Sequence, residues 1–160
     1  VWYGGLTAGI LAGLIFIRIK RYSFWKVADT CAPFLALGYA VVRIGCFLNG
    51  CCYGKVTHSF VGVVFPHVDM FSRYPTQLFS SAINLLLFAL LLWYYPHRRF
   101  SGQIIGFYLI GYAIYRFSIE FFRENWIFVG PLSIAQVYSI LILLLGIVIY
   151  VLRANAARRS

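Results

Sequence analysis

Long apolar stretches separated by short polar segments dominate the chain. Five of them can be marked, at about residues 1–17, 28–49, 78–95, 103–122 and 132–152. Each is close to the roughly 20 residues that a helix needs to cross the hydrocarbon layer of a bilayer. A barrel strand would alternate apolar and polar residues with a period of two, and the run from Ala82 to Tyr95 shows no such alternation. The pattern therefore predicts an all-α membrane protein, a polytopic helical bundle of about five transmembrane helices.

The cations between the apolar stretches predict the orientation of the chain. Nine of the fourteen follow the first, third and fifth stretches: Arg18, Lys20, Arg21, Lys26, Arg98, Arg99, Arg153, Arg158 and Arg159. Short segments rich in Lys and Arg stay on the cytoplasmic side, so we expect a multi-pass topology with a cytoplasmic C-terminus.

Two segments then face outward, residues 50–77 and about 123–131. The longer one contains an apolar run, Val61 to Phe65, among prolines and polar residues. We expect residues 50–77 to form a structured extracytoplasmic loop with a short pair of strands. The chain starts at Val1, inside an apolar stretch and without an initiator methionine. We therefore expect residues 1–160 to be a single transmembrane domain, the C-terminal portion of a longer protein.

The composition excludes a water-soluble domain. Hydrophobic residues make up 62% of the chain and charged residues only 11%, which is far from the mixture of soluble domains. The net charge of +10 is mostly the cytoplasmic excess of cations, which faces the anionic inner leaflet. Membrane lipids, and not nucleic acid, are therefore the expected partners of the basic residues.

Two arginines lie inside apolar stretches, Arg43 and Arg116. A charge within the hydrocarbon costs at least about 2.5 kcal/mol unless it meets protein, water or a partner. Glu120 and Arg123 follow Arg116 at i+4 and i+7, which predicts an ion pair of Glu120 with one or both arginines. The alternatives are a pair that only fixes packing and, for Arg43, snorkelling to the interface. Two guanidinium groups that share one carboxylate favour an anion such as a lipid phosphate.

Further polar residues lie near the predicted helix ends. Asn49 and Gly50 are a strong turn signal at the end of the second helix, and Gln77 follows Arg73 at the start of the third. On the opposite side, Asp29 opens the second apolar stretch, where a carboxylate favours the positive end of the helix dipole.

Three thiols lie close together in the sequence, at Cys46, Cys51 and Cys52. They leave open a function of a different class, a thiol redox or metal-binding membrane protein. Adjacent cysteines form a disulfide only with strain, and neither a second C-x-x-C pair nor a nearby histidine completes a zinc set. We therefore expect no metal and no cofactor.

Several motifs, in a fixed order, resemble the prolipoprotein diacylglyceryl transferase family. They are YGGL at 3–6, ADTCAP at 28–33, RIGCFLNGCCYGK at 43–55, VVFP at 63–66, RYPTQLF at 73–79, GYAIYRFSIEFFRE at 111–124 and LSIAQVYSI at 132–140. The resemblance covers nearly the whole chain, and members of the family carry additional N-terminal helices.

The resemblance implies an enzyme of the bacterial cytoplasmic (inner) membrane. Such an enzyme transfers the diacylglyceryl group of phosphatidylglycerol to the lipobox cysteine in the signal peptide of a prolipoprotein, forming a thioether and releasing glycerol 1-phosphate. The catalytic residues that it implies are Arg43, Arg116, Glu120 and Tyr3. The substrate-binding residues that it implies are Arg43, Asn49, Gly54, Arg73, Gln77, Arg116, Arg123, Gly4 and Gly5. In this interpretation both buried arginines hold the lipid phosphate, and Glu120 orients Arg116.

The chain departs from the family pattern at several positions. The replacements are Tyr3 for His, Cys46 for Asn, Cys51 for Glu, Tyr74 for His and Thr76 for Ser. A phenol, with an ordinary pKa near 10, is a poor base for a thiol whose pKa is about 8.5, so His58 or His67 is an alternative base. The departures leave open a homologue that binds anionic lipid but transfers to another acceptor or has lost catalysis.

Overall fold

Five helices run along the molecule in the computed structural model, which describes residues 2–123, 128–129 and 132–159, with side chains at 9, 11–123 and 132–159. The helices are α1 (Trp2–Lys20), α2 (Phe24–Leu48), α3 (Thr76–Tyr94), α4 (Gln103–Ile119) and α5 (Ile134–Arg159). Short 3-10 helices, η1 (Tyr95–His97) and η2 (Glu120–Phe122), extend α3 and α4. Two antiparallel hairpins join β1 (Val63–Val64) to β2 (Ser72–Arg73) and β3 (Phe128–Val129) to β4 (Leu132–Ser133). The predicted all-α class and the five helices are confirmed.

Four of the described helices are long and apolar enough to cross a membrane. They are Phe24–Leu48, Thr76–His97, Gln103–Phe122 and Ile134–Arg159. Large apolar side chains cover their outer surface, for example Trp93, which is 70% exposed, and Leu152, which is 63% exposed. An apolar surface of this extent suits lipid and not water. The chain is therefore a multi-pass membrane protein, and the membrane crossing of α1 stays a prediction.

Small residues let the helices approach one another closely. α2 packs mainly on α3, and α4 packs mainly on α5, with further contacts of α2 and α3 with α4. Ala32, Ala36 and Ala40 are one turn apart on α2 and are fully buried. On α5, a Cβ at Gly146 would lie 3.0 Å from the Cβ of Leu109. Close packing of helix backbones through small residues is typical of membrane helices, which have no hydrophobic force to bring them together.

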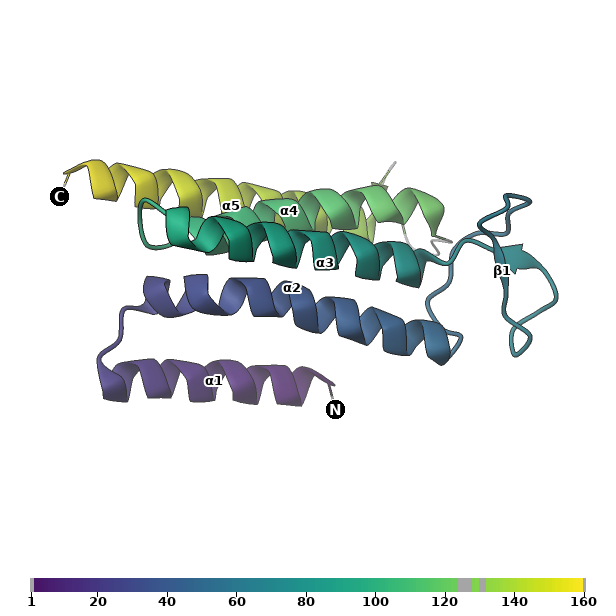
Figure 1. Cartoon of the computed structure of the whole chain (residues 1–160), viewed down its shortest axis with the longest axis horizontal. Helices are drawn as coiled ribbons and strands as arrows, with labels where there is room; N and C mark the ends of the chain where they lie inside the picture. The colour runs from purple at the N-terminus through teal and green to yellow at the C-terminus, as the bar shows by residue number, and fades with distance from the viewer. Residues whose placement is uncertain (1, 124–127, 130–131, 160) are drawn as a thin grey trace.

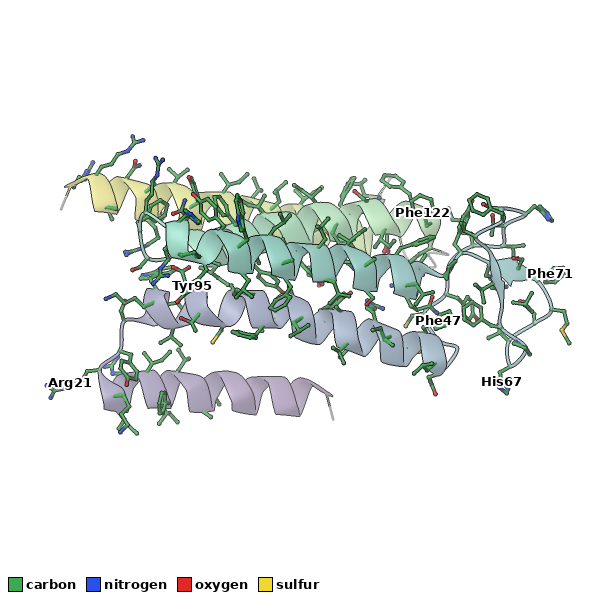
Figure 2. The ribbon with its side chains drawn as sticks, in the orientation of Figure 1. Arg21, Phe47, His67, Phe71, Tyr95 and Phe122 are labelled. Carbon is green, nitrogen blue, oxygen red and sulfur yellow. The ribbon has the colours of Figure 1, made fainter. Side chains whose placement is uncertain are left out.

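Neighbouring helices alternate in direction, which gathers like features at the two ends of the bundle (Figure 1). The C-terminal ends of α2 and α4 and the N-terminal ends of α3 and α5 lie on the side of residues 49–75. We call this side the loop end. The opposite side carries the nine cations that follow the first, third and fifth apolar stretches, and we call it the basic end. Figure 2 shows Arg21 at the basic end and Phe71 at the far edge of the loop end.

The segment between α2 and α3 forms the predicted loop with its strand pair. β1 and β2 are paired with Val63 opposite Arg73. Phe65, only 5% exposed, packs edge-on against Phe47 of α2 with 5.9 Å between ring centroids, and 5.6 Å from the ring of Tyr53. A small aromatic core therefore holds the loop against the end of α2.

A buried carboxylate ties α2 to the start of α4 at the basic end. Asp29 is fully buried, and its Oδ2 and Oδ1 accept hydrogen bonds from the amides of Gly102 at 2.7 Å and Ile105 at 3.0 Å. These amides belong to the first turn of α4, where the backbone lacks intrahelical acceptors and the dipole favours negative charge. The prediction that Asp29 serves the N-terminus of its own helix is therefore wrong. α2 already begins at Phe24, so Asp29 lies inside it and caps a neighbour.

We expect Asp29→Ala to lower the free energy of unfolding by roughly 2–4 kcal/mol, because a buried and a half-buried amide lose their charged acceptor. Thermal unfolding of the detergent-solubilised protein, followed by tryptophan fluorescence, measures the change. Asp29→Asn keeps one acceptor oxygen, so its free energy of unfolding should lie between those of the unaltered protein and Asp29→Ala. Asn155→Ala removes an exposed polar side chain near the end of α5 and serves as the control. An unchanged unfolding temperature for Asp29→Ala would show that the hydrogen bonds from α4 to Asp29 do not stabilise the protein.

Candidate functional site

The turn that ends α2 places Asn49 at the loop end. The amide of Cys51 donates to the carbonyl of Cys46 at 3.0 Å, and the amide of Gly50 donates to the carbonyl of Phe47 at 3.0 Å. Gly50 has a φ of +65°. These features define a Schellman motif, in which a left-handed glycine just past the helix lets two amides satisfy its last carbonyls. The Asn-Gly turn signal at the end of the second helix is thus confirmed.

Arg43 lies over an aromatic ring within the bundle. Its guanidinium donates to the hydroxyl of Tyr39, one turn earlier on α2, and its Cζ lies 4.8 Å from the centroid of that ring. The side chain therefore reaches back along the helix instead of snorkelling outward. Its Nε is buried and lacks a hydrogen-bond partner, and no ion pair of Arg43 occurs within the described residues. The charge of Arg43 is therefore stabilised by an aromatic ring, and no carboxylate among the described residues neutralises it.

Arg116, in contrast, has a carboxylate partner. It forms an ion pair with Glu120, which is 5% exposed and also accepts a hydrogen bond from the Ser133 hydroxyl at 3.1 Å. The predicted pair of Arg116 and Glu120 is confirmed. Ser133 is itself fixed, because its amide donates to the side chain of Gln136 at 2.9 Å and its hydroxyl accepts from the Gln136 amide at 3.2 Å. This reciprocal capping box at the start of α5 holds Glu120 between α4 and α5.

A group of tyrosines connects the two arginines. The ring of Tyr39 packs edge-on against two rings of α4, Tyr112 at 5.6 Å and Tyr115 at 6.1 Å between centroids. The hydroxyl of Tyr115 donates to that of Tyr39 at 3.5 Å. Tyr112 lies within electrostatic range of Arg116, and Tyr115 within that of Arg43. Both guanidinium groups therefore border the same cluster of phenol groups near the loop end.

Gln77 joins the start of α3 to the turn after α2. Its Nε2 donates to the carbonyl of Cys51 at 2.7 Å, and the neighbouring Thr76 hydroxyl donates to the carbonyl of Cys52 at 2.9 Å. Gln77 and Asn84, two turns later on α3, are fully buried, and the side-chain oxygen of each lacks a hydrogen-bond partner among the described residues. A stripe of buried polar groups thus runs from the loop end into the bundle.

Arg73 stabilises the loop itself. Its Nη2 and Nε contact Asp69 Oδ2 at 2.6 and 3.2 Å, its Nη1 donates to the carbonyl of Gly54 at 3.5 Å, and its Cζ lies 4.8 Å from the ring centroid of Tyr53. The hydrogen bond from Arg73 holds the pKa of the Asp69 carboxyl below its usual value. Such a forked pair fixes geometry more firmly than a single contact. These contacts within the loop are enough to explain an arginine at position 73, even if no substrate binds to it.

Gly54 lets the loop pass close to two other segments. Its amide donates to the carbonyl of Tyr74 at 2.9 Å. A Cβ at this position would lie 2.5 Å from the carbonyl oxygen of Phe122 and 2.8 Å from the methyl group of Thr76. Only glycine allows such an approach of backbone to backbone. The predicted binding role of Gly54 thus coincides with a strict packing requirement.

The three thiols of the loop end lie together. The sulfur atoms of Cys46, Cys51 and Cys52 are all within 4.8 Å of one another, and the cysteines are free. Burial raises the pKa of the Cys51 thiol, but hydrogen bonds from Asn49, Cys46 and Cys52 outweigh it, so that this pKa lies below its ordinary value. These hydrogen bonds favour the thiolate form of Cys51, which is the form of cysteine that acts as a nucleophile or binds a metal.

Four other residues that were predicted to belong to the site have no described side-chain contact with it. Tyr3, Gly4 and Gly5 lie in the first turns of α1, outside the part of the chain whose side chains are described. Arg123 follows η2 with a half-buried side chain, and its amide donates to the carbonyl of Glu120 at 3.2 Å.

The two histidines considered as alternative bases lie in the loop. His58 and His67 are both exposed. Figure 2 shows His67 at the outer edge of the loop. Both side chains are open to solvent, and among the described contacts none joins either histidine to Arg43 or Arg116.

Three residues that support the site were not predicted from the sequence. Tyr39 lies four residues before Arg43, and Asp69 lies four residues before Arg73. Ser133 opens the stretch S-I-A-Q, whose first and fourth residues are a capping-box signature. All three therefore had a local signal, either the i,i+4 spacing or the capping pattern.

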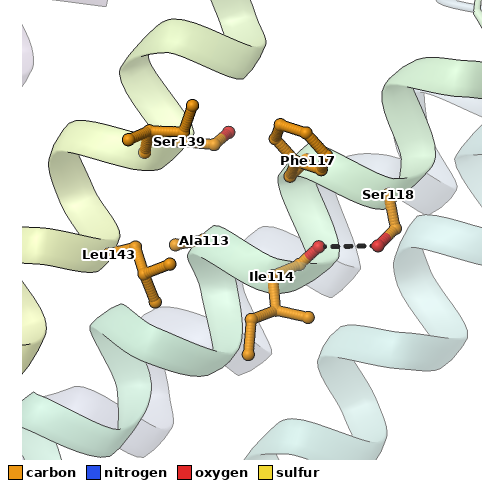
Figure 3. A pocket seen from close by; sticks show the side chains of 7 residues that line it. Ala113, Ile114, Phe117, Ser118, Ser139 and Leu143 are labelled. Atoms are coloured by element: carbon orange, nitrogen blue, oxygen red, sulfur yellow. Dashed lines mark hydrogen bonds between the residues drawn. The ribbon is translucent and has the colours of Figure 1, made fainter.

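An apolar groove lies between α4 and α5, within one turn of Arg116 along α4 (Figure 3). Its volume is about 280 Å³, and it is lined by Ala113, Ile114, Phe117, Ser118, Ser139, Ile140 and Leu143. The Ser118 hydroxyl donates to the carbonyl of Ile114 at 2.9 Å and so is satisfied by its own helix. The Ser139 hydroxyl likewise donates to the carbonyl of Ala135 at 2.7 Å. The groove is therefore chemically apolar and suits a hydrocarbon chain.

The chain is similar to members of one known protein family over most of its length. A model of the family described as prolipoprotein diacylglyceryl transferase matches residues 1–152. A phosphatidylglycerol–prolipoprotein diacylglyceryl transferase of Pasteurella multocida is 36% identical over 165 residues, which cover 99% of this chain and 61% of the relative. Relatives from Bordetella avium and Clostridium perfringens are 38% identical and are covered to 62% and 64% of their length. The chain thus spans about three fifths of the curated relatives it matches.

We expect Gly54→Ala to loosen the loop from the bundle, because the added methyl group would lie 2.5 Å from a backbone oxygen that cannot move independently. A loss of about 1–3 kcal/mol in unfolding free energy is typical of such overpacking. Thermal unfolding and the rate of proteolysis within residues 55–75 measure it. Gly38→Ala, in open space on α2, is the matched control and should be neutral or slightly stabilising. Equal behaviour of the two variants would refute the packing explanation.

Proposed function

The chain belongs to the prolipoprotein diacylglyceryl transferase family, and on that premise we propose that it forms the phosphatidylglycerol-binding part of such an enzyme. The names of the relatives supply the donor lipid and the prolipoprotein acceptor. In this reaction the thiolate of the lipobox cysteine attacks a glyceryl carbon of phosphatidylglycerol. A C–S bond forms, the C–O bond to the phosphate breaks, and glycerol 1-phosphate leaves with the electron pair.

The observation that carries the proposal is the unbalanced positive charge beside the tyrosine cluster. Arg43 and Arg116 both border that cluster, and Glu120 is paired with Arg116. A half-buried charge with no ion-pair partner among the described residues is costly in an apolar environment unless an anion completes the site. A lipid phosphate is the anion that a membrane supplies at this depth.

The chemistry of guanidinium suits both the bound lipid and the departing phosphate. Arginine presents parallel N–H donors to phosphate oxygens. Donors held in place before the reaction stabilise the charge that develops on the leaving group. In our proposal Arg43 and Arg116 contact the phosphate, whereas Glu120 is a positioning residue, since it holds Arg116 and is itself held by Ser133.

The surroundings support a lipid as the ligand. The apolar groove between α4 and α5 approaches within one turn of Arg116 and offers room for part of an acyl chain. Asn49 and Gln77 lie at the same end of the bundle, where we assign them to the shape and polarity of the headgroup site. Arg73, Gly54 and Arg123 contribute by fixing or flanking the loop that would cover it.

We assign the basic end to the cytoplasmic side and the loop end to the outer side of the bacterial inner membrane, because Lys and Arg in short loops stay inside. The C-terminus is then cytoplasmic. The lipobox of a prolipoprotein follows the hydrophobic part of its signal peptide, so its cysteine would reach the outer leaflet beside the loop end. Donor and acceptor would meet there.

A second candidate function is an anionic-lipid-binding homologue with another acceptor or without catalysis. The observation in its favour is that both histidines of the loop are exposed and that no described contact joins them to Arg43 or Arg116. Tyr3 also stands where the family usually has histidine. This candidate predicts binding of phosphatidylglycerol without transfer to a lipobox peptide.

The test is reconstitution of the full-length protein in vesicles of phosphatidylglycerol with a lipobox peptide, and detection of the diacylglyceryl peptide by mass spectrometry. We expect Arg43→Ala and Arg116→Ala each to reduce the rate of transfer by about 100-fold or more, as loss of a preorganised donor does elsewhere. Arg43→Lys should recover little, because an ammonium group cannot form the fork.

Arg159→Ala is the matched control, because it removes a guanidinium from an exposed position at the opposite end of the bundle. Its rate should equal that of the unaltered protein. Bound phosphatidylglycerol without any transferred product would favour the second candidate. Full activity of both Arg43→Ala and Arg116→Ala would exclude the phosphate role of the two arginines.

A further inference from the structure

The end of α2 brings three sulfur atoms to one point through its backbone geometry. In a Schellman motif the residue three positions before the cap and the second residue after it touch through their side chains. These two residues are Cys46 and Cys51, whose main chains are joined by the 3.0 Å hydrogen bond. Cys52 then takes a left-handed φ of +63°, which is uncommon for any residue but glycine. The third thiol joins the other two as a result.

The spacing of the three thiols fits a metal ion. All three sulfur atoms lie within 4.8 Å of one another. Zinc binds thiolates at about 2.3 Å in a tetrahedron, which places sulfur atoms about 3.8 Å apart. Small rotations of the side chains would bring the thiols to this distance. Among the described residues no histidine or carboxylate joins the group, so the three thiolates leave one of the four zinc positions open.

The charge of such a site is balanced by a residue already present. Zn²⁺ with three thiolates carries a net charge of −1. Arg43 lies within electrostatic range of Cys46 and of Cys52, and no ion pair of Arg43 occurs in the described part of the chain. The positive charge of Arg43 therefore lowers the electrostatic cost of a negative zinc site, as it does that of a phosphate bound nearby.

We propose that Cys46, Cys51 and Cys52 bind a zinc ion whose fourth position takes the acceptor thiol of the proposed transfer. The second half of this proposal rests on the proposed function, and the metal site does not. It departs from the sequence-based expectation that no metal is needed. Three protein ligands with one open position are typical of zinc sites that act on a substrate, whereas closed sites have four.

In this proposal the zinc ion brings about the loss of the thiol proton that a histidine base would otherwise accept. The acceptor thiol replaces a water molecule on zinc, its S–H bond breaks, and the proton leaves with water as hydronium, because a thiol that coordinates zinc is deprotonated. The zinc-bound sulfur then attacks the glyceryl carbon. The C–O bond breaks, glycerol 1-phosphate leaves, and the thioether, a weaker ligand than a thiolate, departs from zinc. No oxidant or reductant takes part.

Metal binding is tested with the full-length protein in detergent, reduced and freed of metal with a chelator. Titration with Co²⁺ should give one ion per chain, with charge-transfer absorption of three thiolates, and Zn²⁺ should abolish it. Cys46→Ser, Cys51→Ser and Cys52→Ser should each weaken zinc binding by about 100-fold or more, since a ligand matters at least as much as its outer-shell partners. Cys31→Ser, at an exposed thiol elsewhere on α2, should bind as the unaltered protein does.

The Co²⁺ spectrum of the unaltered protein counts the thiolates even where a serine variant fails to fold. Absence of the charge-transfer band, or zinc binding that survives Cys51→Ser, would overturn the site. A Cys46–Cys51 disulfide in protein isolated from membranes without reductant, seen as a mass loss of two hydrogens, would also overturn it.

The role of the metal is tested in the transfer assay at neutral pH. Removal of zinc should slow formation of the diacylglyceryl peptide by at least about 10-fold, zinc should restore it, and binding of phosphatidylglycerol should not change. Equal rates with and without bound zinc would overturn the activation step alone. No product from either form, with the Co²⁺ spectrum intact, would instead overturn the proposed function and leave the metal site standing.

Discussion

The fold depends on one constraint: a polar group in an apolar environment needs a partner within the protein. The two buried carboxylates of the described chain satisfy it by joining helices. Asp29 of α2 accepts hydrogen bonds from the first turn of α4, and Glu120 at the end of α4 accepts from Arg116 and from Ser133 before α5. One tie lies at each end of α4. The helix that carries Arg116 is thus fixed at both ends by charge, while its sides face mostly apolar groups.

Features set by local sequence could be predicted. The helices follow from the length and hydropathy of the apolar stretches, and the strand pair of the loop follows from Val61 to Phe65. Arg116 and Glu120 could be paired because the i,i+4 spacing places two side chains on one face of a helix. The end of α2 followed from Asn49 and Gly50, since few residues other than glycine take the left-handed conformation that a Schellman motif requires.

Features that depend on contacts between distant segments could not be predicted from the sequence. The amides that Asp29 caps lie 73 and 76 residues away along the chain, and no local pattern indicates them. Gly54 is required because Phe122 passes beside it, which depends on how η2 meets the loop. The spacing of the three cysteines along the sequence does not by itself indicate a metal-binding motif. They converge only because the turn joins Cys46 to Cys51 and because Cys52 takes an unusual backbone conformation.

Arg43 links the two halves of the site through its charge. It borders the tyrosine cluster on one side and lies within electrostatic range of the thiols on the other. Both participants in the proposed reaction, a phosphodiester and a thiolate, are anions that would repel each other on close approach. A guanidinium between them lowers that repulsion, because its charge is opposite to theirs. Because no carboxylate among the described residues pairs with Arg43, its charge is free to act on both anions at once.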